Sequence, residues 1–412
     1  MVLKLVVACA VLGFVHAQPV KQVPVLKDAP EEVLFRVQDP PAPFELDCAV
    51  ESGDSSDFSF KWSKDDQDID LIDNPHIEQQ GSKLIFKEPK DDDEGVYQCF
   101  ATILEGVATS SPIRVKKAYI NFVPSETLNR VTPVKGRPFH LDCELPEGYP
   151  KPTIEWKRQI GDGQPEGIRN PRIFSPQGNL YFTNATDEDV SVDSKYVCYV
   201  NSPALQQEVA QVQYLVEGLA EDTEPADNEL VQLFASSDFT AKVGDVTPIY
   251  CIYGGNALPP DWWKDGVNVN NSPGDRVTRH NRSKGKRLLI KDTLPEDEGN
   301  YTCIVSNEAG KVEKHTVHLN VVSAPRFAKK PEKRVQAAVG DVVKLPCDVE
   351  NISPSGDSYW TYNTKPTDNA RISVNELELT IKNVQKSDSG YYGCKAVNDL
   401  GQNYTETYLQ VL

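Results

Sequence analysis

The chain has 412 residues, 39% of them hydrophobic, and a formal net charge of −18 from 61 acidic and 43 basic side chains. This length is too great for one hydrophobic core and predicts three or four domains of roughly 100 residues each. The acidic balance argues against nucleic acid as a partner, because binding to a phosphate backbone needs an excess of Lys and Arg.

The N-terminus has the composition of a secretory signal peptide. Lys4 precedes an apolar run from Leu5 to Val15, and a cleavage point follows before Gln18. The run has about 11 residues, whereas a membrane-spanning helix needs about 20. We therefore expect removal of residues 1–17 and a secreted, extracellular protein. No membrane span is expected, because no second apolar run of sufficient length follows.

Nine cysteines are present, of which Cys9 lies in the expected signal peptide. The other eight form an even set that an oxidising compartment converts to disulfides. Paired in order, they close four loops of roughly 50 residues, each crosslink contributing about 4 kcal/mol by the chain-entropy argument. No close Cys-x-x-Cys or Cys/His cluster is present, so neither a metal nor another cofactor is expected. The expected disulfides are Cys48–Cys99, Cys143–Cys198, Cys251–Cys303 and Cys347–Cys394.

Four repeats follow, each with strand-like alternation. In the first, residues 18–117, the stretches Phe44 to Cys48 and Phe58 to Trp62 alternate, and Asp93 to Cys99 reads Asp-Glu-Gly-Val-Tyr-Gln-Cys. Residues two apart on a strand share a face, so the Tyr and Cys of this motif point inward together. The Tyr hydroxyl then needs a backbone partner upstream, and the Gly permits the close approach of the chain there.

The second repeat, residues 118–217, departs from this motif. Val192 and Ser194 stand where the other repeats have Asp and Gly, and the stretch before Cys198 is longer. We expect an irregular loop there that is still closed by Tyr196. In the third repeat, residues 230–321, alignment with the first makes Trp262 the core residue and turns Trp263 outward. The fourth repeat occupies residues 322–412.

The joints between the repeats differ in length. Those near residues 117–119 and 320–326 are short, whereas residues 218–229 form an acidic linker without alternation. Twelve residues span about 40 Å when extended, which is enough for the chain to double back. We expect a folded-back horseshoe, with an extended flexible rod as the alternative.

The repeats share a Cys, a Trp 11 to 14 residues later, and the motif Asp-x-Gly-x-Tyr-x-Cys, which is degenerate in the second repeat. This set of residues resembles the intermediate set (I-set) of the immunoglobulin superfamily. The resemblance covers nearly all of the chain after the signal peptide and implies an all-β fold of four tandem immunoglobulin-like sandwiches. The distal domains of adhesion molecules of the L1 and axonin kind are similar and also have a long joint after the second domain.

The whole arrangement resembles the soluble four-domain insect immune proteins of this superfamily. That resemblance implies a haemolymph protein that associates with bacterial lipopolysaccharide, binds haemocytes and modulates their adhesion, partly through homophilic contacts. The alternative is a soluble adhesion module with homophilic or cell-surface contacts and no small ligand. Neither is an enzyme, and the scattered histidines have no nucleophile or metal spacing around them.

A basic strip in the third repeat is the most distinctive charge feature. Arg binds phosphate in bidentate fashion and Lys adds point charges, so such a strip can hold the phosphates of lipid A. A solvated strand edge that resists aggregation explains the same residues. The expected phosphate-binding and lipopolysaccharide-binding residues are Arg276, Arg279, Arg282, Lys284, Lys286 and Arg287.

Two further charged regions follow from the sequence. The basic run Lys329, Lys330, Lys333 and Arg334 would lie near the acidic first domain in a folded-back chain, and salt would weaken that attraction. The acidic cluster between Asp65 and Asp73 has no EF-hand spacing, so a solvated surface is favoured over a calcium site.

Glycosylation is expected at Asn-x-Ser/Thr sequons. The sequon at Asn270 is expected to be a weaker acceptor of sugar than the others, because Pro273 follows its triplet. The expected sites are Asn184, Asn281, Asn300, Asn351 and Asn403.

Overall fold

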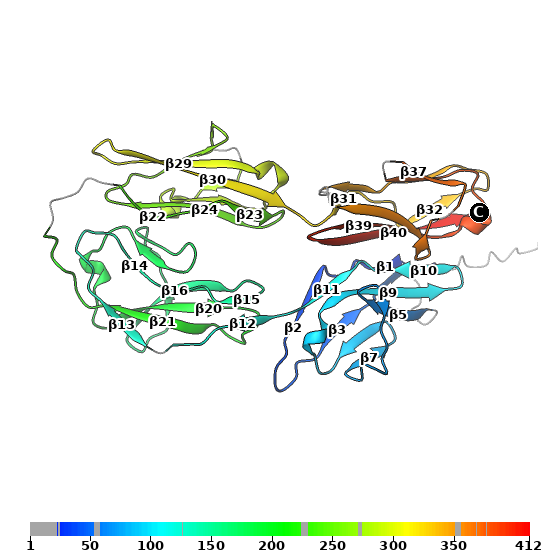
Figure 1. The fold of residues 1–412 in the computed structure, drawn as a ribbon, viewed down its shortest axis with the longest axis horizontal. Helices are drawn as coiled ribbons and strands as arrows, with labels where there is room; N and C mark the ends of the chain where they lie inside the picture. Colours follow the sequence, from blue (N-terminus) through cyan, green and yellow to red (C-terminus); the bar gives the residue numbers. More distant parts are fainter. Residues whose placement is uncertain are drawn as a thin grey trace, which may run out of the picture.

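The computed structural model describes residues 23, 25–52, 58–125, 127–223, 230–270, 274–350, 356–367, 369–375 and 377–412, with the side chains of Ser52 and Asn281 left out. The expected signal peptide lies outside these residues, as does the second half of the expected acidic linker. The described chain forms four β-sandwiches in sequence order, here called sandwiches one to four (Figure 1).

Sandwich one pairs the sheet β2-β11-β9-β5-β6, with β10 beside β9, against β3-β8-β7, and β1-β4 forms a short extra pair. Its elements are β1 (Val25–Leu26), β2 (Glu32–Phe35), β3 (Phe44–Asp47), β4 (Val50–Ser52), β5 (Ser59–Lys64), β6 (Gln67–Asp68), β7 (Ile77–Gln80), β8 (Lys83–Phe86), the 3₁₀ turn η2 (Asp91–Asp93), β9 (Gly95–Ile103), β10 (Gly106–Thr109) and β11 (Ile113–Lys117).

Sandwich two has the sheets β13-β21-β20-β16-β17, β14-β19-β18 and β12-β15. Its elements are β12 (Tyr119–Asn121), β13 (Leu128–Val131), β14 (Phe139–Leu141), β15 (Glu147–Tyr149), β16 (Thr153–Ile160), β17 (Glu166–Gly167), β18 (Ile173–Phe174), β19 (Leu180–Phe182), η3 (Asp187–Asp189), β20 (Ser194–Asn201) and β21 (Val209–Val216).

Sandwich three has the sheets β23-β30-β29-β25-β26 and β22-β24-β28-β27. Its elements are β22 (Val231–Ala235), β23 (Phe239–Lys242), β24 (Thr247–Gly254), β25 (Asp261–Lys264), β26 (Val267–Asn268), β27 (Val277–Arg279), η4 (Asn281–Ser283), β28 (Arg287–Ile290), η5 (Pro295–Asp297), β29 (Gly299–Ser306) and β30 (Val312–Val322).

Sandwich four has the sheets β32-β40-β39-β35-β36, β33-β38-β37 and β31-β34. Its elements are β31 (Arg326–Lys329), β32 (Arg334–Ala337), β33 (Val343–Leu345), β34 (Asp348–Glu350), β35 (Asp357–Tyr362), β36 (Lys365–Pro366), β37 (Ile372–Asn375), β38 (Glu378–Ile381), η6 (Lys386–Asp388), β39 (Gly390–Asn398) and β40 (Gly401–Val411). In all four sandwiches an early strand pairs in parallel with the last strand, as β32 does with β40.

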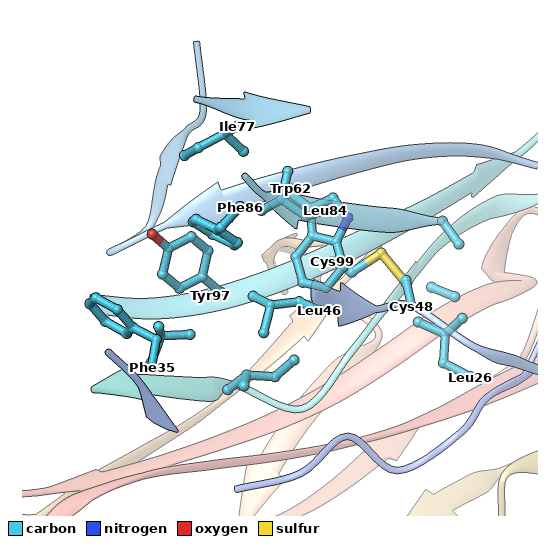
Figure 2. Close-up of a cluster of buried hydrophobic side chains, with 14 of the residues drawn as sticks. Leu26, Phe35, Leu46, Cys48, Trp62, Ile77, Leu84, Phe86, Tyr97 and Cys99 are labelled. Atoms are coloured by element: carbon cyan, nitrogen blue, oxygen red, sulfur yellow. A yellow bond between two sulfur atoms is a disulfide. The ribbon is translucent and has the colours of Figure 1, made fainter. Parts of the chain in front are cut away.

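Each core is built around a disulfide between the two sheets and a buried tryptophan. Figure 2 shows this arrangement in sandwich one, where the Trp62 ring lies beside the disulfide and Tyr97 lies farther from it, next to Phe86. Trp262 is 1% exposed, so the register inferred from the sequence is confirmed, and its Nε1 donates to the Gly285 carbonyl oxygen at 2.7 Å. The disulfides in the structure are Cys48–Cys99, Cys143–Cys198, Cys251–Cys303 and Cys347–Cys394.

The buried tyrosine of the repeated motif closes the corner before its strand in three sandwiches. The Tyr301 hydroxyl donates to the Asp297 carbonyl oxygen at 2.9 Å, and Tyr97 and Tyr392 do the same in sandwiches one and four. A Cβ on Gly299 would lie 2.4 Å from the Asp265 carboxylate, and φ there is +147°, so only glycine fits.

Sandwich two lacks this hydrogen bond, so the expectation that Tyr196 closes its loop in the same way was wrong. Tyr196 is buried and packs edge to face against Phe182, with ring centroids 5.4 Å apart. Within the described chain, no backbone carbonyl accepts its hydroxyl. Ser194, in place of the motif glycine, accepts a hydrogen bond from Arg158 Nε at 2.7 Å.

The chain folds back on itself between sandwiches two and three. Sandwich one lies beside sandwich four, and sandwich two beside sandwich three, giving the horseshoe seen in Figure 1. The described half of the expected linker is not a free spacer, because Ala220 forms a bridge with Val134, and Asp222 accepts from Arg137 Nε at 2.8 Å. The first half of the joint is thus held along sandwich two.

Candidate functional site

Sandwiches one and four meet through the outer face of β39 and β40. Alternation on β39 turns Tyr392 into the core of sandwich four and Tyr391 toward sandwich one. Tyr391 and Tyr408 are 3% and 5% exposed and belong to the same buried cluster as Trp62 and Tyr97. Sandwich one therefore buries part of its hydrophobic surface against a segment roughly 300 residues later in the sequence. The entropy cost of closing such a long loop increases only slowly with the length of the loop.

Charged groups surround this contact. Lys333 Nζ lies 2.7 Å from Glu51 Oε2, and Lys395 Nζ lies 3.2 Å from Asp66 Oδ1. Arg334 donates to the Val23 carbonyl oxygen at 2.6 Å. The second basic run thus reaches acidic sandwich one, as expected for a folded-back chain. Both ion pairs are partly solvated, so they orient the two sandwiches more than they stabilise them.

Sandwiches two and three meet through aromatic rings and a close backbone approach. The Tyr181 and Phe234 rings are 5.9 Å apart between centroids, beside a groove of about 420 Å³. A Cβ on Gly254 would lie 2.9 Å from both Pro138 and the Thr183 carbonyl oxygen. Any side chain larger than hydrogen at this position would force the two sandwiches apart.

The two short joints are fixed by hydrogen bonds. Ala118, between sandwiches one and two, is buried, and its N–H donates to the Phe35 carbonyl oxygen at 2.7 Å. Between sandwiches three and four, Asn398 and Asn403 donate side-chain N–H groups to Ser323 and Pro325 at 2.9 and 3.1 Å. These hydrogen bonds hold each of the two short joints in one arrangement.

Two members of the expected phosphate-binding strip have structural partners. Arg276 binds the buried Asp297 carboxylate through two guanidinium nitrogens, one of them 3.0 Å from Oδ1. Lys286 is 8% exposed, and its Nζ lies 5.4 Å from the Phe174 ring centre in sandwich two. Burial, and to a lesser extent Lys284, lowers the pKa of Lys286. Both side chains therefore serve the fold or the contact between sandwiches.

The other four members, Arg279, Arg282, Lys284 and Arg287, remain together on β27, β28 and the turn between them. Arg282 and Lys284 are exposed, and the other two are half-buried. None of the four forms an ion pair within the described part of the chain. Burial and then the charges of Arg287 and Arg282 lower the pKa of His280. The positive charges around His280 thus add to burial in disfavouring its protonated form.

The partnership between Arg276 and Asp297 is one of a set that sequence reasoning missed. A basic side chain directly before an edge strand (β7, β18, β27 or β37) meets the aspartate of the corner turn in each sandwich. That aspartate also accepts an N–H of its own turn. A basic residue or histidine 17 to 21 positions before the aspartate of the corner turn is the signal that could have found them. The equivalent pairs are His76–Asp93, Arg172–Asp189, Arg276–Asp297 and Arg371–Asp388.

The sequons differ in their surroundings. Asn300 is exposed, and only its Oδ1 is engaged, 3.0 Å from His318 Nδ1, so its Nδ2 can carry a sugar. Asn184 is half-buried. The Asn403 Nδ2 is already committed to Pro325 at the joint. Asn351 and the side chain of Asn281 lie outside the described part of the chain.

The acidic cluster of sandwich one is dispersed in the structure. Asp66 pairs with Lys395 and Asp68 with Lys61. Over the described residues, no group of three or more metal-ligating side chains converges on one point. In the same part of the chain, no helix is long and apolar enough to cross a membrane.

Comparison with known proteins places this geometry in a family. Residues 232–321 and 325–411 match the immunoglobulin I-set domain, and residues 28–102 match an immunoglobulin domain. Hemolin of Manduca sexta is 45% identical over 417 residues, with 100% of both chains covered. The chain belongs to the hemolin family.

Other comparisons agree with this assignment. Hemolin of Hyalophora cecropia is 44% identical, with 98% of this chain and 97% of that relative covered. The crystal structure of the insect immune protein hemolin, described as a new domain arrangement with implications for homophilic adhesion, matches with a TM-score of 0.87 at 43% identity, over 95% of this chain and 100% of that chain. Neuroglian of Drosophila melanogaster is 35% identical over 93% of this chain, which spans 30% of its length.

Membership of the hemolin family confirms three expectations from the sequence. The chain has the four-domain immunoglobulin-like fold, it is an insect immune and adhesion protein, and it is not an enzyme. The family also accounts for the horseshoe, because the hemolin crystal structure superposes over nearly the whole chain rather than over single domains.

Proposed function

We propose that this member of the hemolin family is a secreted recognition protein that binds bacterial lipopolysaccharide through the lipid A phosphates and binds haemocytes, whose adhesion it modulates. The observation that supports this most directly is the group Arg279, Arg282, Lys284 and Arg287, which makes no ion pair in the described structure. Guanidinium groups suit the bidentate binding of phosphate, and exposed Lys adds attraction at longer range.

The proposal also includes secretion into haemolymph after removal of residues 1–17, the domain division 18–117, 118–217, 230–321 and 322–412, and glycosylation. The four disulfides support an oxidising compartment. Asn281 lies between Arg279 and Arg282 in the sequence, so the proposal of phosphate binding requires that this sequon be unoccupied.

Charge reversal at the exposed members tests phosphate binding. In the double variant Arg282→Glu/Lys284→Glu we expect affinity for phosphorylated lipid A to fall by at least about tenfold, since two charge-assisted contacts of about 1 to 2 kcal/mol each become repulsive. Binding is measured by titration calorimetry or surface plasmon resonance against phosphorylated and dephosphorylated lipid A.

The matched control is Lys242→Glu/Lys314→Glu, which changes net charge equally at exposed positions on other strands of sandwich three. It should bind as the unchanged protein does. Equal affinity of the unchanged protein for the two lipid A forms would overturn phosphate recognition and leave the alternative, a soluble homophilic or heterophilic adhesion module without a small ligand. The description of the hemolin crystal structure, with its implications for homophilic adhesion, favours that second candidate.

A further inference from the structure

A carboxyl group lies within the contact between sandwiches one and four. Glu406 is on β40, between Tyr404 and Tyr408, and its side chain shares their direction toward sandwich one. It is half-buried and lines an interface cavity of about 200 Å³ together with Thr109 and the three tyrosines Tyr391, Tyr404 and Tyr408. Polar groups inside such a contact need partners, and a charge needs a counter-charge.

Glu406 has hydrogen-bond donors but no counter-charge. The Thr109 N–H on β10 lies 3.0 Å from both carboxylate oxygens, and the Tyr404 hydroxyl donates to Oε2 at 3.0 Å. No Lys, Arg or His of the described residues forms an ion pair with it. The donor from sandwich one is therefore a neutral backbone amide 297 residues away in the sequence.

The charged groups around the contact are already engaged or stand at its edge. Lys333 and Lys395 pair with Glu51 and Asp66 at the rim. Lys27, Asp28 and Lys330 also line the cavity, with Lys330 Nζ 5.9 Å from the Phe327 ring centre. The remaining charged groups near the contact are Glu105, Arg114 and Arg334. The two arginines each donate to a carbonyl oxygen of the opposite sandwich.

Burial raises the pKa of Glu406 to about 8, and the hydrogen bonds from Thr109 and Tyr404 oppose that shift without cancelling it. Burial likewise raises the pKa of Tyr391, Tyr404 and Tyr408 above the usual tyrosine value. These hydroxyls stay neutral through the range in which Glu406 titrates. Glu406 is thus the group inside the contact whose charge changes near neutral pH.

We propose that Glu406 is a proton-operated latch, so that the contact between sandwiches one and four is tighter when Glu406 is neutral and looser when it is ionised. In the open form the carboxyl is solvated and returns to its ordinary pKa of about 4.5, so closing takes up one proton. The contribution to closure is complete below the ordinary pKa and is lost as the pH rises through about 8. Acid tightens the horseshoe, and mild alkali loosens it.

The size of this pH effect follows from the difference between the pKa of Glu406 in the closed form and its pKa in the open form. Between pH 6 and pH 9 the closing equilibrium constant should fall by up to about 100-fold, most of it below pH 8. The hydrogen exchange of the Thr109 amide measures this constant directly, because the amide is protected only while the contact is closed. Protection factors, corrected for the intrinsic pH dependence of exchange, are compared with those of core amides on β39, which report global unfolding.

Two variants complete the experiment. Glu406→Gln keeps the size and an acceptor for Thr109 but cannot ionise, so Thr109 protection should be independent of pH. Glu105→Gln removes an exposed carboxylate at the rim and should keep the full pH dependence. A constant protection factor in the unchanged protein from pH 6 to 9 overturns the proposal, as does a Glu406→Gln variant with undiminished pH dependence. If Glu406→Gln does not fold, the pH dependence of Thr109 protection in the unchanged protein and in Glu105→Gln still decides whether the proposal holds.

Discussion

Replacing Tyr391 and Tyr408 together by alanine should open the horseshoe while sandwich four stays folded. Both rings point away from the core of sandwich four, pack edge to face with centroids 4.9 Å apart, and are buried against sandwich one. Truncating one buried aromatic side chain costs about 3 to 5 kcal/mol, so the pair exceeds what the solvated ion pairs at the rim can offset. Small-angle scattering of dilute protein should show a larger radius of gyration.

The matched control is Tyr359→Ala, which removes a tyrosine of the same sandwich that is 44% exposed. Its radius of gyration should equal that of the unchanged protein. An unchanged radius in the double variant would mean that the contact between sandwiches one and four depends on something other than these two rings.

Replacing Asp297 by alanine should destabilise sandwich three by about 3 kcal/mol. The change leaves the guanidinium of Arg276 without its partner and the Leu294 N–H without its acceptor. In a domain of this size such a loss lowers the midpoint of thermal unfolding by more than about 10 °C. Differential scanning calorimetry should show one transition shifted while the others stay in place.

Asp275→Ala is the control, because Asp275 is an exposed aspartate next to Arg276 in sequence. It should leave all transitions unchanged. An Asp297→Ala protein with unchanged thermal unfolding would show that Arg276 is free to bind phosphate, contrary to its place in the structure.

The core of each sandwich could be predicted from the sequence because its residues obey local rules. Period-two alternation fixes which side chains face inward, and the Cys, Trp and Tyr of each repeat are the large side chains that fill the space between the sheets. The placement of Trp262 inside and Trp263 on the outer face follows from this alternation. The lack of a corner hydrogen bond from Tyr196 in the described chain could not be predicted, because Tyr196 is buried like its counterparts and alternation does not give the partner of its hydroxyl.

The sequence predicted that the basic run of sandwich four would lie near sandwich one, but it did not predict the burial of Tyr391 and Tyr408 between them. Joint lengths only permitted the chain to fold back. On β40 the alternation that places Leu409 in the core also places Tyr408 on the outer face, where tyrosine is an ordinary surface residue. Its burial arises from a segment roughly 300 residues away, and no local pattern carries that information.

The candidate phosphate site was only partly predictable for a related reason. The cations of the strip are adjacent in sequence, yet Arg276 turns to Asp297, and Lys286 lies under Phe174 of sandwich two. A basic run in the sequence indicates which charges are close together, but it does not indicate which of them have partners in the fold. The four residues left without ion pairs in the described structure make the proposed phosphate site smaller than the one that the sequence predicted.

Zero-length cross-linking tests most directly whether sandwiches one and four meet within one chain. Carbodiimide joins an amine to a carboxylate only in direct contact, and Lys333 Nζ lies 2.7 Å from Glu51 Oε2. In an equal mixture of ¹⁴N-labelled and ¹⁵N-labelled protein, we predict linked Lys333–Glu51 peptides whose two halves carry the same isotope. Linked peptides of mixed isotope would contradict the folded-back chain by showing that the contact forms between molecules, and absence of the link would show an extended one.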